Sequence, residues 1–193
     1  MTVMLLGLVI FLGAHSSRIV AEPWRERAIA RLGPSGWKGA YSLVSLLGLV
    51  LIVWGFGIAR AQPVLLWLPP VWTRHVAAPL VLIAFVLVAA AYVPGNALKA
   101  RLHHPMLLGV KVWAFAHLLA NGRLHDVVLF GAFLLWAVLD YRAARARDRA
   151  SSAVYARGRM VPTLVAAAVG VLGWAVFAFW AHRLLFGVAP FGP

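Results

Sequence analysis

The stretch HHPMLLGVKVWAFAHLLANG, residues 103–122, joins a long apolar run to histidines near both ends and a lysine in its middle. Pro105 suits the first turn of a helix, where its missing N–H leaves no hydrogen bond unmade. An ionisable side chain costs about 3 kcal/mol at the centre of a bilayer on insertion scales, so such residues mark functional sites by default. The stretch therefore predicts a membrane helix from Pro105, with His104, Lys111 and His117 as candidate site residues.

The composition of the whole chain predicts a membrane protein. Hydrophobic residues make up 63% of the 193 residues, charged residues make up 12%, and the mean hydropathy is +0.88, values too apolar for a soluble domain. In a soluble protein the net charge of +13 would favour a nucleic-acid partner. Here the basic residues lie between apolar runs, so we expect them to face anionic lipid of the bilayer and expect no nucleic-acid partner. The chain has no cysteine, which excludes disulfides and thiolate metal sites.

Apolar runs recur along the chain. About 20 residues at 1.5 Å per residue cross a hydrocarbon core of ~30 Å, so we expect an all-α, polytopic bundle of about six transmembrane helices. The runs cover residues 3–20, 40–59, 76–93, 105–122, 127–141 and 161–186. Residues 21–39 have the pattern of a short amphipathic helix at the headgroups, ended by the Gly33-Pro34 pair.

Basic residues are distributed unevenly between the connections. The connections after the first, third and fifth runs hold 13 of the 18 Lys and Arg residues, and the opposite connections hold Arg60, Arg74, Arg123 and Arg183. The positive-inside rule places the first group in the cytoplasm and both termini on the opposite side of the membrane. We expect residues 1–145 to form a five-helix transmembrane domain, and residues 146–193 a basic cytoplasmic loop with a sixth transmembrane helix.

Histidines within the apolar runs suggest a haem site. Imidazole is a common ligand of haem iron, and a haem between helices needs inward-facing histidines at matched depth. His15 and His117 are the most deeply set, but they lie roughly 6 Å and 7 Å on opposite sides of the middle of their runs, at 1.5 Å per residue. Spacing alone therefore leaves both His104 and His117 open as the partner of His15. The structural alternative is that each histidine only packs and bonds to a carbonyl.

Four motifs are shared with a known family. They are GAHSSRI at 13–19, GWKGAYSLVSL at 36–46, YVPGN at 92–96 and HPMLLGVKVWAFAHLLANG at 104–122. Through them, residues 5–142 resemble the NnrU family of bacterial membrane proteins, whose relatives include the plant 15-cis-zeta-carotene isomerase. The chain after about residue 145 lies outside this resemblance. A bacterial family implies a multi-pass protein of the inner membrane, with both termini in the periplasm.

The resemblance implies a haem b cofactor. The plant isomerase binds a b-type haem through two histidines and isomerises a cis double bond of a carotenoid when the iron is ferrous. Its ligand motifs match His15, which precedes Ser16, and His117, which follows Ala116. The relative has further histidines on the segment that matches residues 127–141, where this chain has none, so haem binding carries over better than isomerase activity.

Three functional hypotheses follow. The first is a haem protein with a redox, sensing or accessory role, and the family name ties that role to nitrogen-oxide respiration in denitrifying bacteria. The second is a haem-dependent isomerase of a lipophilic, polyene-like substrate. The third is an accessory membrane subunit without cofactor. Under the first two, Arg18 and Lys111 are candidates to pair with the haem propionates, although a carboxylate of Asp140 or Asp126 would also satisfy Lys111.

Overall fold

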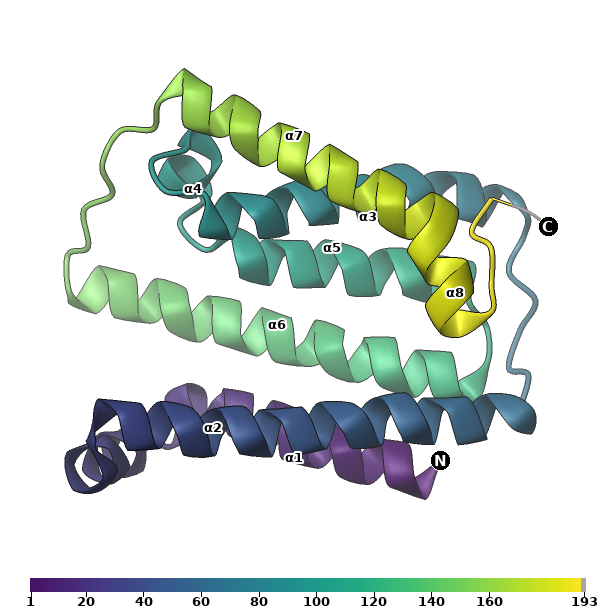
Figure 1. Ribbon diagram of the computed structural model, residues 1–193, viewed down its shortest axis with the longest axis horizontal. Helices are drawn as coiled ribbons and strands as arrows, with labels where there is room; N and C mark the ends of the chain where they lie inside the picture. The colour runs from purple at the N-terminus through teal and green to yellow at the C-terminus, as the bar shows by residue number, and fades with distance from the viewer. Residues whose placement is uncertain (192–193) are drawn as a thin grey trace.

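The computed structural model describes residues 1–191, and in this part of the chain it is all-α, with no β-strand (Figure 1). The predicted fold class is thus confirmed. The helices are α1 (Thr2–Val20), α2 (Glu22–Ala61), α3 (Trp72–Tyr92), α4 (Ala97–Leu102), α5 (Pro105–Ala120), α6 (Leu124–Ala150), α7 (Met160–Val176), the π-helical segment η1 (Phe177–Ala181) and α8 (His182–Phe186).

Within residues 1–191, five stretches are long and apolar enough to cross a membrane: α1, α2, α3, α6 and the continuous run from α7 through α8. The predicted fourth span corresponds to α5, which is apolar but has only 16 residues. At 1.5 Å per residue α5 is roughly 24 Å long, slightly less than a typical hydrocarbon core. The predicted count of about six is consistent with this set. As predicted, the fourth span begins at Pro105, with His104 as its N-cap residue.

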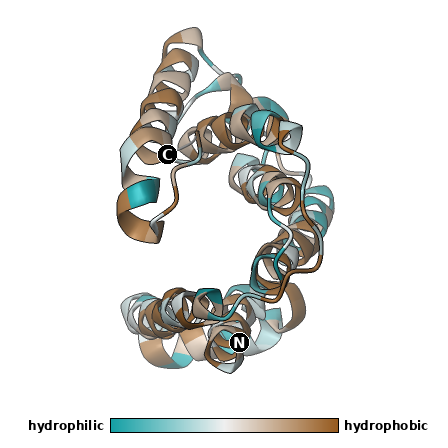
Figure 2. Cartoon of the chain, turned by 90° about the vertical axis from the view of Figure 1, so that its right-hand side faces the viewer, coloured by the Kyte–Doolittle hydropathy of each residue, from teal (hydrophilic) through white to brown (hydrophobic). Residues whose placement is uncertain are grey.

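The helices are arranged in a curved row. Neighbours in the row are α2, α1, α6, α5, α3 and α7, in that order. Figure 2 shows the row bent like the letter C, with α1 and α2 in one arm and α7 and α8 in the other. The Arg60 side chain on α2 donates a hydrogen bond to the Phe186 carbonyl on α8 and so joins the two arms at one end. Because a row covers each helix on two sides only, many apolar side chains remain exposed for lipid.

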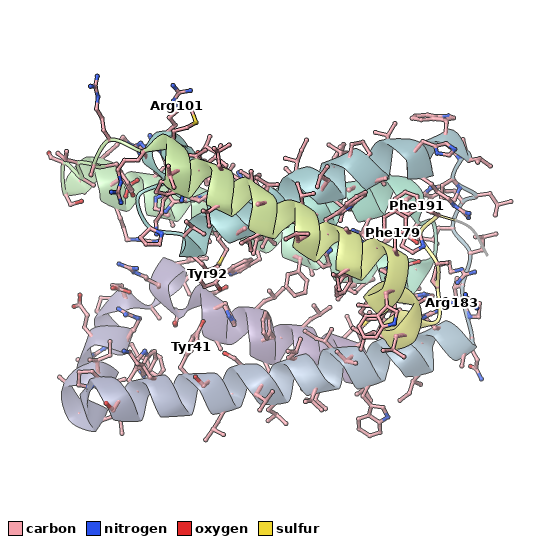
Figure 3. The ribbon with its side chains drawn as sticks, turned by 45° about the horizontal axis from the view of Figure 1, so that its top comes forward. Tyr41, Tyr92, Arg101, Phe179, Arg183 and Phe191 are labelled. Carbon is pink, nitrogen blue, oxygen red and sulfur yellow. The ribbon has the colours of Figure 1, made fainter. Side chains whose placement is uncertain are left out.

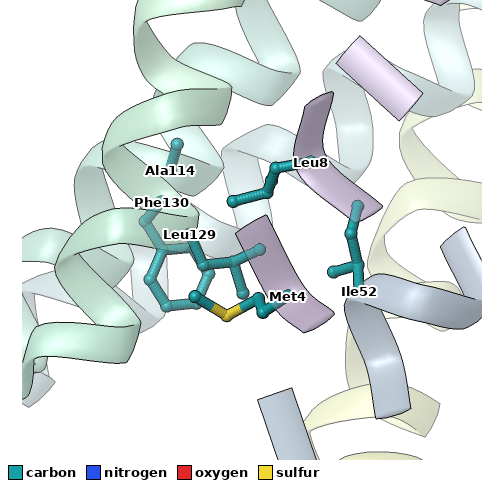
Figure 4. Packing of buried hydrophobic residues seen from close by; sticks show 6 residues of the cluster. All are labelled: Met4, Leu8, Ile52, Ala114, Leu129 and Phe130. Atoms are coloured by element: carbon teal, nitrogen blue, oxygen red, sulfur yellow. The ribbon is translucent and has the colours of Figure 1, made fainter. Parts of the chain in front are cut away.

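The contact between α1 and α2 is very close because glycines face it. A Cβ added at Gly7 would lie 2.5 Å from the backbone nitrogen of Ile52, and one added at Gly48 would lie 2.7 Å from that of Phe11. Small residues of this kind let helix backbones approach within a membrane. Beside this contact, side chains from α1, α2, α5 and α6 form the core cluster in Figure 4: Met4, Leu8, Ile52, Ala114, Leu129 and Phe130.

Helix boundaries differ from the prediction in two places. The amphipathic segment ends as predicted, because Gly33 leaves the helical conformation (φ 72°, ψ 164°) and divides α2 into a short first stretch and a long second one. The long stretch begins at Pro34, six residues before the predicted second span. The fifth span is longer than residues 127–141, since α6 runs from Leu124 to Ala150 through the charged sequence after Tyr141. That sequence is rich in Ala and Arg, which favour helix.

Candidate functional site at the basic end

A cavity of about 690 Å³ opens at the end of the bundle where α1 and α6 finish and α2 and α5 begin. We call this the basic end, because the connections rich in Lys and Arg meet there. His15, Arg18 and His104 line the cavity, whereas His117 and Lys111 are not among its lining residues. The structure thus brings three of the five predicted site residues to one cavity.

His15 is held on α1 with one ring nitrogen left unpaired. Its Nδ1 lies 2.7 Å from the Phe11 carbonyl oxygen, and because a carbonyl only accepts, Nδ1 is the protonated donor. The ring stacks on Phe11 at 4.2 Å and meets Trp136 edge-on at 5.9 Å between ring centroids. Within residues 1–191 no hydrogen bond to its Nε2 is found, so Nε2 carries a lone pair open to a ligand.

His117 repeats this arrangement on α5. Its Nδ1 donates to the Trp113 carbonyl oxygen at 2.8 Å, and its ring stacks on Phe130 at a centroid distance of 4.5 Å. The Asn121 side chain donates to the His117 carbonyl oxygen at 2.9 Å and closes the end of the helix. In the described part of the chain, His117 Nε2 likewise has no hydrogen-bond partner. A carbonyl on Nδ1 fixes the tautomer in which Nε2 can bind a metal.

The two histidines flank α6 at different depths. His15 contacts Trp136 and His117 contacts Phe130, residues six apart on α6, which corresponds to roughly 9 Å along the helix. A ring bonded to the carbonyl four residues earlier leans toward the N-terminus of its own helix. Because α1 and α5 run in opposite directions, the two rings lean toward each other. The rings between them are Phe11, Phe133 and Trp113.

These residues fit haem iron in donor type: two imidazoles of fixed tautomer in aromatic, apolar surroundings. One iron takes both ligands only where the two Nε2 atoms face each other across it. In the described structure Phe11, Phe133 and Trp113 lie between the two rings, so His15 and His117 would hold one haem only if these side chains moved aside. The depth difference expected from the sequence is thus also present in the folded chain.

The remaining predicted residues have protein partners of their own. His104 Nε2 lies 2.9 Å from Asp148 Oδ2, and Arg18 Nε lies 3.8 Å from Glu22 Oε1. Lys111 Nζ lies 3.9 Å from the centroid of the Tyr141 ring, a cation–π contact between α5 and α6.

The two carboxylates expected as alternatives for Lys111 have other partners. Asp140 Oδ1 lies 3.6 Å from Arg147 Nη2, and Asp126 Oδ1 lies 3.5 Å from His125 Nε2. The aromatic partner of Lys111 was missed because Tyr141 lies at the predicted end of its span, where the sequence gives no reason to point it inward.

A polar cluster at the rim of the cavity was also missed. Asp148 on α6 accepts hydrogen bonds from the His104 ring and, at 3.1 Å, from the Tyr155 hydroxyl. Tyr155 also stacks on His103 at 4.0 Å. Burial raises the pKa of Tyr155, and the bond to Asp148 raises it further. The cluster forms because residues 151–159 cross the basic end between α6 and α7, a path that the sequence does not reveal (Figure 1).

Comparison with known proteins identifies the family. The family model described as "NnrU protein" matches residues 3–190. This match extends well beyond residues 5–142 and includes the last membrane helix. Neither the curated proteins nor the solved structures contain a match to the chain.

Proposed function

Because the chain belongs to the NnrU family, we propose that it is a bacterial inner-membrane protein that binds haem b through His15 and His117. One observation carries the proposal: both histidines donate Nδ1–H to a carbonyl of their own helix and leave Nε2 without a protein partner within residues 1–191. Bound haem would supply one-electron redox chemistry and an iron that can exchange a ligand. A redox, sensing or accessory role in nitrogen-oxide respiration rests on the family association.

The other site residues support this function to different degrees. Arg18 lines the cavity beside His15 and would reach a haem propionate from the basic end. His104 lines the same cavity and is the competing ligand, but its Nε2 is engaged by Asp148. Lys111 would have to leave the Tyr141 ring to reach a carboxylate.

The first test is an absorption spectrum of the full chain, expressed with ample haem and purified in detergent. We expect a Soret band in the oxidised protein and the sharp bands of a six-coordinate b-type haem after dithionite reduction. His15→Ala and His117→Ala should each lose the six-coordinate low-spin spectrum. His75→Ala, at an exposed position of α3, is the matched control and should leave it unchanged.

Two outcomes would contradict this proposal. A protein without a Soret band despite ample haem does not bind the cofactor. A low-spin spectrum that survives His117→Ala but is lost in His104→Ala would transfer the second ligand to His104.

Haem-dependent isomerisation is the second candidate function. The observation that favours it is the cavity beside His15, whose wall includes Trp37, Tyr41 and Trp136, an apolar and aromatic surface suited to a polyene. The reduced protein, incubated with a cis-carotenoid in detergent, should then release the trans isomer. Haem binding without conversion would favour the redox or sensing role.

Membrane orientation is part of the proposal. We place the basic end in the cytoplasm and both termini in the periplasm, since the Lys and Arg residues gather at that end. A reporter that is active only in the periplasm should be active when fused to the C-terminus. Activity of a cytoplasm-only reporter at the same position would reverse the orientation.

A further inference from the structure

The cavity at the basic end has more cationic than anionic side chains in its wall. The charged lining residues are Arg18, Arg25, Lys99 and Arg147 on the cationic side, and Asp140 and Asp148 on the anionic side. Asp148 already accepts hydrogen bonds from the rim cluster of His104 and Tyr155. The wall is therefore electropositive and attracts an anion.

The arginines of this wall share few carboxylates. Glu22 Oε1 lies 2.9 Å from Arg25 Nη1 and 3.8 Å from Arg18 Nε, so one carboxylate pairs with two guanidinium groups. Arg147 has its nearest carboxylate oxygen, on Asp140, at 3.6 Å. Since each guanidinium carries five N–H donors, most of these donors remain available to a ligand.

Lys99 is the clearest case of a cation without an anionic partner. Its Nζ donates to the Ala91 carbonyl oxygen at 2.9 Å, and within residues 1–191 no carboxylate lies within 4.0 Å of it. An ammonium group has three donors, so two remain after this bond. A half-buried lysine that lines a cavity in this state has donors free to bind an anion from outside the protein.

We propose that this cavity is a binding site for the anionic head group, carboxylate or phosphate, of an amphiphilic molecule taken from the bilayer. Lys99, Arg25 and Arg147 bind the head, and the apolar body lies along the aromatic wall of Trp37, Tyr41 and Trp136. The site stands at the end of the membrane helices, the depth at which lipid head groups lie. It does not depend on iron ligation and goes beyond haem binding.

The test compares two lipids with the same acyl chains on the full chain in neutral detergent. Dioleoyl phosphatidic acid should bind at least tenfold more tightly than dioleoyl phosphatidylcholine, measured by titration with native mass spectrometry. Lys99→Gln should weaken phosphatidic acid binding about tenfold, the effect of losing one charge-assisted hydrogen bond. Lys99→Arg keeps the charge and should retain most of the affinity.

Arg101→Gln is the matched control. Arg101 lies on the same short helix, α4, but is exposed and points away from the bundle (Figure 3). This variant should change the affinity less than about twofold, because an exposed charge contributes little. Equal binding of the two lipids would overturn the proposal, because it would show no selection for an anionic head group. Equal losses in Lys99→Gln and Arg101→Gln would also overturn it, because they would show attraction to the basic surface in general and not to this cavity.

A competition experiment distinguishes the two sources of the head group. If porphyrin carboxylates occupy the site, haem should displace phosphatidic acid and haem dimethyl ester should not. If neither displaces it, the head is a phospholipid phosphate. A protein that lacks a Soret band but still selects phosphatidic acid would contradict haem binding and leave the anion site standing.

Discussion

The two ends of the bundle both contain buried or half-buried charged groups, but only one of them is closed. At the end opposite the cavity, His125 is 2% exposed, lies 3.5 Å from Asp126 and packs edge-on against Phe56 at 5.1 Å. Arg60 joins the two arms at that end through the Phe186 carbonyl. At the basic end, the cations of the cavity share few carboxylates and surround an open space.

The difference shows how partners decide the role of a charged residue at a membrane boundary. Where each polar group finds a protein partner, it closes the structure and leaves no room for a ligand. Where donors outnumber acceptors around a cavity, the same residue types form a binding site. Three changes test this distinction, beginning with the one that should cost most.

Gly122→Ala should open the closed end. An added Cβ would lie 2.0 Å from the Trp67 carbonyl oxygen, and residues 66 and 67 both donate backbone hydrogen bonds to the Gly122 carbonyl. Because backbone cannot move aside as a side chain can, we expect a loss of about 3 kcal/mol in unfolding free energy, at the upper end of overpacking effects. Thermal unfolding in detergent would measure it.

Gly57→Ala is the control for that change. A Cβ at Gly57 meets no atom within 4 Å, and alanine is the better helix former, so stability should rise slightly. Equal melting temperatures for the two variants would show that the connection of residues 62–71 does not hold the closed end.

Asp126→Ala should cost about 2 kcal/mol, because it removes the only nearby carboxylate of the buried His125 within the described residues. Asp140→Ala is the counterpart at the basic end. Its 3.6 Å pair with Arg147 is partly exposed and should contribute less than about 1 kcal/mol. Losing that carboxylate should also tighten phosphatidic acid binding. A larger loss of stability from Asp140→Ala than from Asp126→Ala would contradict this comparison, because it would give the structural role to the carboxylate at the basic end.

Sequence reasoning predicted the membrane helices but only part of the site. Apolar runs and Pro105 sufficed for the spans because helix length and bilayer thickness are local constraints. His15, Arg18 and His104 were candidates from the sequence and meet at one cavity, whereas Lys99 and Asp148 were missed. Their importance depends on which helices are neighbours in the curved row and on the path of residues 151–159, which no local pattern encodes. The Tyr141 partner of Lys111 was missed for the same reason.

Tyr155→Phe should have the smallest effect and acts on the rim of the open end. The hydroxyl bond to Asp148 contributes about 0.5–1 kcal/mol. Burial raises the pKa of Tyr155 above its ordinary value of 10.0, so the folded chain holds this proton more tightly than the unfolded chain. The contribution is therefore complete below pH 10 and is lost as the pH rises through the folded-state pKa. Unfolding measured from pH 8 to 11 should show a steeper decline in the unsubstituted protein than in Tyr155→Phe. Parallel declines would mean that Tyr155 does not hold its proton in the folded rim, and that this connection crosses the basic end without bonding to it.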